Sequence, residues 1–260
     1  MQAINIRYQL YLHWPKIGFL VIGLMLCQFK VQAQARFNEI SKAGQDEKLI
    51  SYGFFLAGHN NYYQLKYSDA FVDPNSGIGT NIESIVPVFT PGFSLGFLAI
   101  FRFHDQVNLM FTPKIGFYEF KTDINFFDNA PSSNNDISFN RRTETVVSEV
   151  TMVEFPLLFK YKAQRFNNSR MFFTAGGSAM FRTKDQEEAD IDFIVTTGRD
   201  FTVDLGIGFD MYFRYFKFSP EIRFSHGLNN IYRPETTDAR IRDVISELRR
   251  KSITLYLHFQ

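Results

Sequence analysis

The stretch PEIRFSHGLNNIY, residues 220–232, places Ser225 beside His226 and close to two asparagines. A histidine that takes the proton from a serine hydroxyl is the arrangement of a hydrolase nucleophile, which raises the hypothesis of a lipid hydrolase. In a strand, however, successive side chains point to opposite faces. Ser225 and His226 would then be separated, and Leu228 occupies the position that shares a face with His226. The chemistry of this stretch therefore depends on the element that carries it.

Alternation of apolar and mixed residues with a period of two recurs along the chain and predicts β-strands. In residues 93–103, every odd position is apolar, whereas Ser94, Gly96 and Arg102 occupy even positions. Eight such runs are predicted, at residues 51–59, 93–103, 107–117, 153–161, 171–182, 201–213, 218–226 and 253–259. The seventh run contains the Ser-His pair, which favours a strand with one polar face over an active site.

The connections between these runs alternate in length. The long ones are residues 60–91, 122–148, 184–199 and 229–249, and the short ones are residues 104–106, 163–170 and 215–217. This alternation is typical of outer-membrane barrels. A soluble barrel would turn its apolar faces inward, but the long, clean apolar faces favour contact with lipid. We therefore predict an all-β fold: an eight-stranded antiparallel transmembrane β-barrel with four long extracellular loops and three short periplasmic turns.

The beginning of the chain has the features of a signal peptide. Arg7 and Lys16 precede an apolar run at residues 17–27, and Ala33 and Ala35 offer a cleavage site. A membrane anchor is the alternative, but about 11 apolar residues are too few to span a bilayer. The predicted organisation is a signal peptide at residues 1–35, a periplasmic segment at residues 36–50 and an outer-membrane barrel at residues 51–260. The predicted location is the bacterial outer membrane.

Composition excludes several classes of function. The chain has 28 Lys and Arg against 27 Asp and Glu, so a net charge of +1 argues against nucleic acid as a partner. The histidines that follow the predicted signal peptide are scattered, at His59, His104, His226 and His258. No phosphate-binding loop or cysteine motif is present. We expect no enzyme activity, metal, cofactor or small-molecule substrate, and we expect outer-membrane lipid as the surrounding partner.

Charged residues on the mixed faces of the predicted strands are expected to point into the barrel. Buried charges need partners, so these residues predict a structural polar network across the interior. An eight-stranded barrel has an interior that side chains fill, which argues against a conducting pore. The residues assigned to this network are Lys114, Glu154, Lys160, Asp204, Asp210, Arg214, Glu221 and Arg223.

The last long connection contains a different pattern. Ile241, Val244, Ile245 and Leu248 recur at helical spacing within TTDARIRDVISELRRKS. This spacing predicts a short amphipathic helix. Its apolar face would either pack on the rim of the barrel or contact another protein.

Three segments carry a resemblance to a known family: VEFPLLFKYK, VDLGIGFDMYFRYFKFSPEIRFSHGLNNIY and RKSITLYLHFQ. They resemble the PorT family of outer-membrane barrels from Bacteroidetes, over about residues 50–260. The resemblance implies a non-enzymatic accessory role in type IX protein secretion, with gliding motility in some members, and other secretion-system proteins as partners. A structural or adhesive barrel of the same superfamily is the alternative, followed by an outer-membrane lipid hydrolase.

Overall fold

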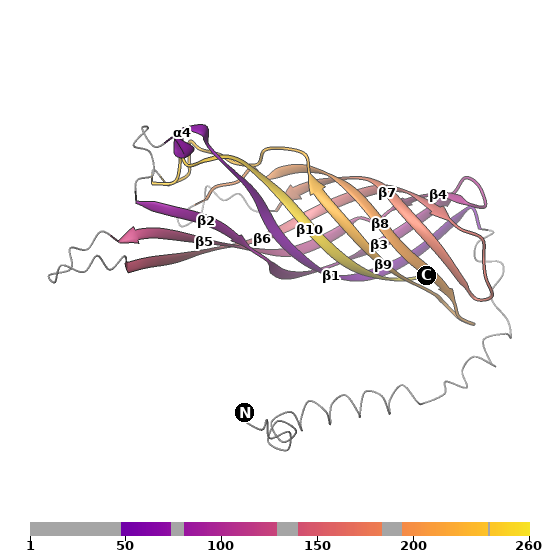
Figure 1. Ribbon diagram of the computed structural model, residues 1–260. Coiled ribbons are helices and arrows are strands. Elements are labelled where there is room, and N and C mark those ends of the chain that lie inside the picture. Colours follow the sequence, from indigo (N-terminus) through magenta and orange to yellow (C-terminus); the bar gives the residue numbers. More distant parts are fainter. Residues whose placement is uncertain (1–47, 74–80, 129–139, 184–193, 239) are drawn as a thin grey trace, which may run out of the picture. The chain divides into compact units, whose positions relative to one another are not determined.

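The computed structural model describes residues 48–73, 81–128, 140–183, 194–238 and 240–260 (Figure 1). The predicted signal peptide and nearly all of the predicted periplasmic segment lie outside these residues, so both stay predictions. No helix in the described ranges is long and apolar enough to cross a membrane.

Almost every described element is a β-strand. The bounds are β1 Ile50–Tyr67, α4 Asp69–Val72, β2 Ile82–Val88, β3 Thr90–Arg102, β4 Val107–Phe111, β5 Lys114–Asp128, β6 Asn140–Lys162, β7 Ser169–Arg182, β8 Arg199–Tyr212, β9 Lys217–Gly227 and β10 Ile245–Phe259. The short helix α4 follows β1 and is capped by the Ser68 hydroxyl, which accepts a hydrogen bond from the backbone of Phe71.

The ten strands form a closed antiparallel barrel with eight strand positions, because two of these positions are each occupied by two consecutive strands. Phe89 alone separates β2 from β3, and Thr112 and Pro113 separate β4 from β5. Proline has no backbone N–H to donate, which explains the break between β4 and β5. β2 and β3 share one place in the ring, because both pair with β5. β4 and β5 share the next place, because both pair with β3 and both pair with β6.

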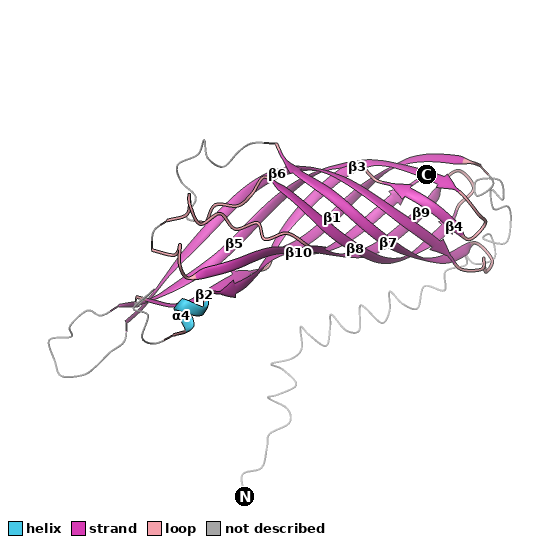
Figure 2. Ribbon diagram, turned by 90° about the horizontal axis from the view of Figure 1, so that it is seen from above, coloured by secondary structure: helices cyan, strands magenta, loops and turns pink. Residues whose placement is uncertain are grey.

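The ring closes at β1. This strand pairs with β10 on one side, from Phe54 opposite Phe259 to Tyr67 opposite Ile245. On its other side it pairs with β3, from Ile50 opposite Phe101 to Asn61 opposite Thr90. The prediction of an eight-stranded antiparallel barrel is confirmed, and Figure 2 shows its strands inclined to the long axis.

The outer wall is apolar, as the alternation predicts. Along β8, Phe201, Val203, Leu205, Ile207 and Phe209 are exposed, and the residues between them point inward. The same arrangement covers β3, where Phe93, Leu95 and Phe97 are exposed. In an outer-membrane barrel this face contacts lipid.

Some predicted loops are partly strand. Residues 122–148 were expected to form one long connection, but β5 continues to Asp128 and β6 starts at Asn140. Polar cross-strand pairs replace apolar alternation here: the Thr143 hydroxyl donates to Asn125 at 2.8 Å, and the Thr145 hydroxyl donates to Asp123 at 2.7 Å. These paired ends of β5 and β6 extend beyond most other strands (Figure 1).

The lipid-facing wall generates a prediction about the middle of β8. Leu205 is 57% exposed, and arginine at that position should cost about 2–4 kcal/mol because its charge would meet hydrocarbon. Phe201 faces the same way nearer the extracellular end of β8, where the cost falls to about 0–1 kcal/mol.

The measurement is urea unfolding of Leu205→Arg and Phe201→Arg in lipid vesicles, followed by heat-modifiable migration on gels. Leu205→Arg should unfold at the lower urea concentration. Equal stability of the two variants would contradict the assignment of this face.

Candidate functional site

The Ser225–His226 pair cannot act as a catalytic unit. Both residues lie on β9, where Ser225 lies opposite Ser252 and faces a small interior cavity. His226 lies opposite Lys251 and lines a groove on the outer face. The two side chains are therefore on opposite sides of the wall, as strand geometry requires.

Buried ion pairs lie along the interior of the barrel. At the periplasmic end, Lys160 Nζ donates to Asp210 Oδ1 at 2.7 Å, and the Ser219 hydroxyl donates to the same oxygen at 2.6 Å. Lys217 Nζ lies 3.8 Å from the other carboxylate oxygen. Lys160 also lies 3.6 Å from the centre of the Phe172 ring. The buried Asp210 carboxylate thus lies beside two ammonium groups, those of Lys160 and Lys217. Such pairing offsets the cost of burying the charges.

A second carboxylate, Glu221, organises the middle of the interior. Arg223 donates to both of its oxygens, at 3.0 and 3.1 Å, and the Thr174 hydroxyl donates at 2.6 Å. His258 Nε2 lies 2.9 Å from Glu221 Oε2. The Arg223 guanidinium lies 4.1 Å from the Tyr256 ring centre, so an aromatic face also stabilises the cation.

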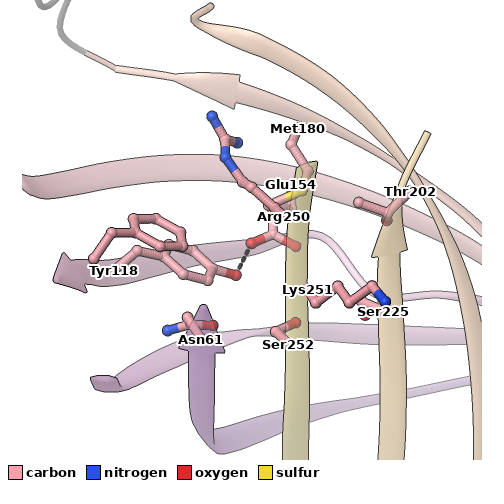
Figure 3. Close-up of a pocket in the computed structure, with 10 residues that line it drawn as sticks. Asn61, Tyr118, Glu154, Met180, Thr202, Ser225, Arg250, Lys251 and Ser252 are labelled. Atoms are coloured by element: carbon pink, nitrogen blue, oxygen red, sulfur yellow. Dashed lines mark hydrogen bonds between the residues drawn. The ribbon is translucent and has the colours of Figure 1, made fainter. Parts of the chain in front are cut away.

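Tyr256 connects this group to a third ion pair. Lys114 Nζ donates to the Tyr256 hydroxyl at 2.9 Å and lies 2.9 Å from Glu154 Oε2. The Tyr118 hydroxyl donates to Glu154 (Figure 3). The three groups belong to β5, β6 and β10, so the contact ties separate parts of the ring together.

A small cavity of about 20 Å³ adjoins the Lys114–Glu154 pair. Figure 3 shows Tyr118, Glu154, Arg250 and Ser225 around it. A volume of this size has room for about one water molecule. Arg250 Nη1 lies 3.9 Å from Asp200, and Asp204 accepts hydrogen bonds from Ser178 and Thr202. Around this cavity, the described inward-facing side chains are buried and mostly paired.

The structure places seven of the eight residues assigned to the network inside the barrel: Lys114, Glu154, Lys160, Asp204, Asp210, Glu221 and Arg223. Arg214 is the exception. It lies exposed in the turn between β8 and β9, because β8 ends at Tyr212 and the alternation stops there. Assigning Arg214 to the interior is wrong.

Sequence reasoning missed several buried polar residues: His59, Lys162, Asp200, Lys217, Arg250 and His258. Strand alternation does put Lys162 on the face of Lys160 and His258 on the face of Thr254, but the predicted network includes neither residue. Strand alternation does not identify Arg250 as an inward residue, because Arg250 falls within the segment predicted to be helical.

The expected helix of the last loop is wrong. The described residues from 240 to 244 form turns, and Ile245 begins β10. Ile241, Val244, Ile245 and Leu248 are all buried, at 0–3% exposure. The stripe is thus covered by the protein itself and does not offer a surface for a partner.

These side chains belong to an apolar cluster that fills the extracellular half of the interior. Its members include Tyr63, Ile82, Ile85, Phe120, Ile124, Val146, Val150, Met152, Met180, Ile194, Ile231 and Tyr232. The Ile231 N–H donates to the Leu248 carbonyl at 2.9 Å, and the Tyr232 hydroxyl donates to the Arg242 carbonyl at 2.8 Å. Burial raises the pKa of that hydroxyl, so it remains a donor. The loop therefore folds onto the barrel as a cap.

An apolar outer wall around a closed antiparallel ring, with charges paired inside, defines an outer-membrane β-barrel. The family whose model matches, over residues 32–233, is described as an outer membrane protein beta-barrel domain. The match covers more than half of the chain, and the chain belongs to this family. The protein is thus a β-barrel of the bacterial outer membrane.

Solved structures with a similar arrangement come from other outer-membrane proteins. OprG from Pseudomonas aeruginosa is 9% identical, with 80% of this chain and 94% of OprG covered and a TM-score of 0.40. Neisserial surface protein A is 9% identical, with 81% and 98% covered and a TM-score of 0.41. The translocator domain of the autotransporter NalP from Neisseria meningitidis is 12% identical, with 88% and 95% covered and a TM-score of 0.27. A search of curated protein sequences gives no significant match.

The Lys114–Glu154 pair generates a stability prediction. Lys114→Met leaves a buried carboxylate without its cation and should lower the free energy of unfolding by about 3–5 kcal/mol. Lys114→Met combined with Glu154→Gln should recover part of that loss, because no buried charge is left unpaired. Urea unfolding in vesicles measures both variants. A double variant no more stable than Lys114→Met would show that the two residues are not coupled.

The loop cap generates a second prediction. Ile241→Asp buries a charge in the apolar cluster and should release residues 229–244 from the barrel. Protease added to intact cells should then cut this loop faster than in the wild type, while the barrel stays heat-modifiable on gels. Arg240→Asp is the matched control, because Arg240 is exposed. Equal cleavage of the two variants would argue against the cap.

Proposed function

We propose that this barrel is a non-enzymatic accessory component of protein secretion across the outer membrane, in a type IX system. The proposal rests on the resemblance of three segments, two of which contain the interior charges. VEFPLLFKYK carries Glu154 and Lys160, and the segment from Val203 to Tyr232 carries Asp210, Glu221 and Arg223. Cargo export, and gliding motility in some relatives, is the activity that this family resemblance implies.

The observation that carries the proposal is the filled interior. Ion pairs occupy its periplasmic half and middle, and the apolar cluster with the folded loop occupies its extracellular half. A secreted protein could pass through the barrel only if these paired and packed side chains moved aside. The barrel would therefore assist export through its surfaces and its partners, with the cargo passing elsewhere.

One surface suited to this role is the extension of β2, β5 and β6. The β5–β6 ladder runs as far as Asp128 opposite Asn140, and β2 adds to its other side from Ile82 to Val88. At the junction with β1, the Tyr67 hydroxyl donates to the Ile85 carbonyl at 3.0 Å and accepts from the Ile85 N–H at 2.9 Å. This ordered sheet offers other secretion proteins a fixed contact surface.

A structural or adhesive role is the second candidate. The same extension favours it, since the paired ends of β5 and β6 reach beyond most other strands and could contact a surface or another cell (Figure 1). A structural or adhesive barrel would need only the closed wall and this extension, with no role in cargo export.

Disruption of the gene, followed by mass spectrometry of secreted proteins, separates the two candidates. We expect loss of proteins that carry the C-terminal export domain from the medium and their accumulation in the periplasm, with recovery when the wild-type gene is restored. Intact export from a strain that lacks the protein would exclude the secretion role and favour the structural one. Restoring the gene with residues 125–143 replaced by a short turn would then test the hairpin extension.

A further inference from the structure

A groove of about 550 Å³ lies on the outer face of the wall, near the extracellular ends of β1, β9 and β10. Its polar lining consists of Gln64, Lys66, His226, Glu247, Arg249 and Lys251. Such a collection is unusual for a wall whose other outward positions are mostly apolar. It is also separate from the interior network, because the wall lies between them.

The strand register brings these side chains together. Lys251 on β10 lies opposite His226 on β9 and opposite Tyr62 on β1. Two residues before Lys251 on β10, Arg249 lies opposite Gln64 on β1. All of them face outward, because the residues that alternate with them, such as Arg250 and Leu248, are buried inside.

Positive charge exceeds negative charge in the groove. Its lining has three permanent cations, Lys66, Arg249 and Lys251, against one carboxylate, Glu247. Arg249 pairs with that carboxylate. Within the described parts of the chain, neither Lys66 nor Lys251 has a carboxylate partner. Lysines on a lipid-facing wall are costly unless they reach water or an anion.

The level of the groove in the membrane follows from its neighbours. Tyr62, which lies opposite Lys251, packs against the exposed Phe89 with ring centres 4.4 Å apart. Aromatic residues of this kind mark the interface between lipid and water. Below them, toward the periplasmic end, Phe224 and Ile253 are exposed and begin the apolar wall. The cations thus lie at headgroup level and the apolar rows at acyl-chain level.

We propose that this groove binds the phosphorylated headgroup of an outer-leaflet lipid, with the acyl chains of that lipid lying on Phe224 and Ile253. Arginine and lysine are the side chains that bind phosphate best, and two cations without carboxylate partners match the charge of a phosphate. The combination of an anionic head and apolar chains fits the combination of groove and wall. This inference is independent of the proposed role in secretion.

The test compares the full chain refolded in phosphatidylcholine vesicles that contain either a phosphorylated lipid A or the same lipid without phosphate. Bound lipid is quantified by mass spectrometry after detergent extraction and affinity purification. We expect the wild type to retain the phosphorylated form preferentially. Equal retention of the two forms would overturn the proposal, because the groove would then contribute nothing to recognition.

Variants assign the effect to the groove. Lys66→Gln combined with Lys251→Gln should weaken retention of the phosphorylated lipid about 25-fold, since each lysine near an anionic lipid contributes roughly fivefold. Lys121→Gln is the control, because Lys121 pairs with Glu119 elsewhere on the wall. Heat-modifiable migration checks that every variant is folded. Equal loss in the control and the double variant, or no loss in either, would contradict the proposal.

A photo-crosslinking amino acid at position 226 identifies the occupant in intact cells. A lipid adduct supports the proposal. A protein adduct without a lipid adduct would overturn it and assign the groove to an acidic protein partner.

Discussion

Satisfaction of the backbone hydrogen bonds is the constraint on which the rest of the structure depends. A strand in lipid has no water to bond with, so every N–H and C=O in the wall must find a neighbouring strand. The pairing of β1 with both β10 and β3 meets this requirement by leaving no open edge in the membrane. Closure then fixes which side chains face lipid and which face the narrow interior.

The interior follows from that closure. Inward positions are cut off from bulk water, so each charge there must be matched by another, and Asp210, Glu221 and Glu154 each meet at least one cation. The pairs also protect the register. A shift of one residue would turn Lys160 or Arg223 toward lipid, and the cost of that exposure opposes slippage. Polarity inside the barrel thus contributes specificity as well as filling.

The sequence predicts the wall well because strand alternation is a local property, and the rows of Phe93 to Phe97 and Phe201 to Phe209 are visible without the fold. It predicts which charges point inward but not their partners, since Lys114 meets Tyr256 only through ring closure. The last loop shows the limit most clearly. Ile241, Val244, Ile245 and Leu248 have helical spacing, yet β10 begins at Ile245 and the barrel interior covers all four. Tertiary burial outweighed local periodicity there.

The seam between β1 and β10 has a consequence for how the barrel forms. Phe54 lies opposite Phe259, so strand pairing joins residues from the two ends of the barrel sequence. Contacts of such wide sequence separation form slowly, because the entropy of closing the loop is lost before the contacts repay it. Hairpins between neighbouring strands can form first, but the last strand must arrive before the ring exists. Until then β1 and β10 remain unpaired edges that attract other chains, so the barrel depends on protection during its passage to the membrane.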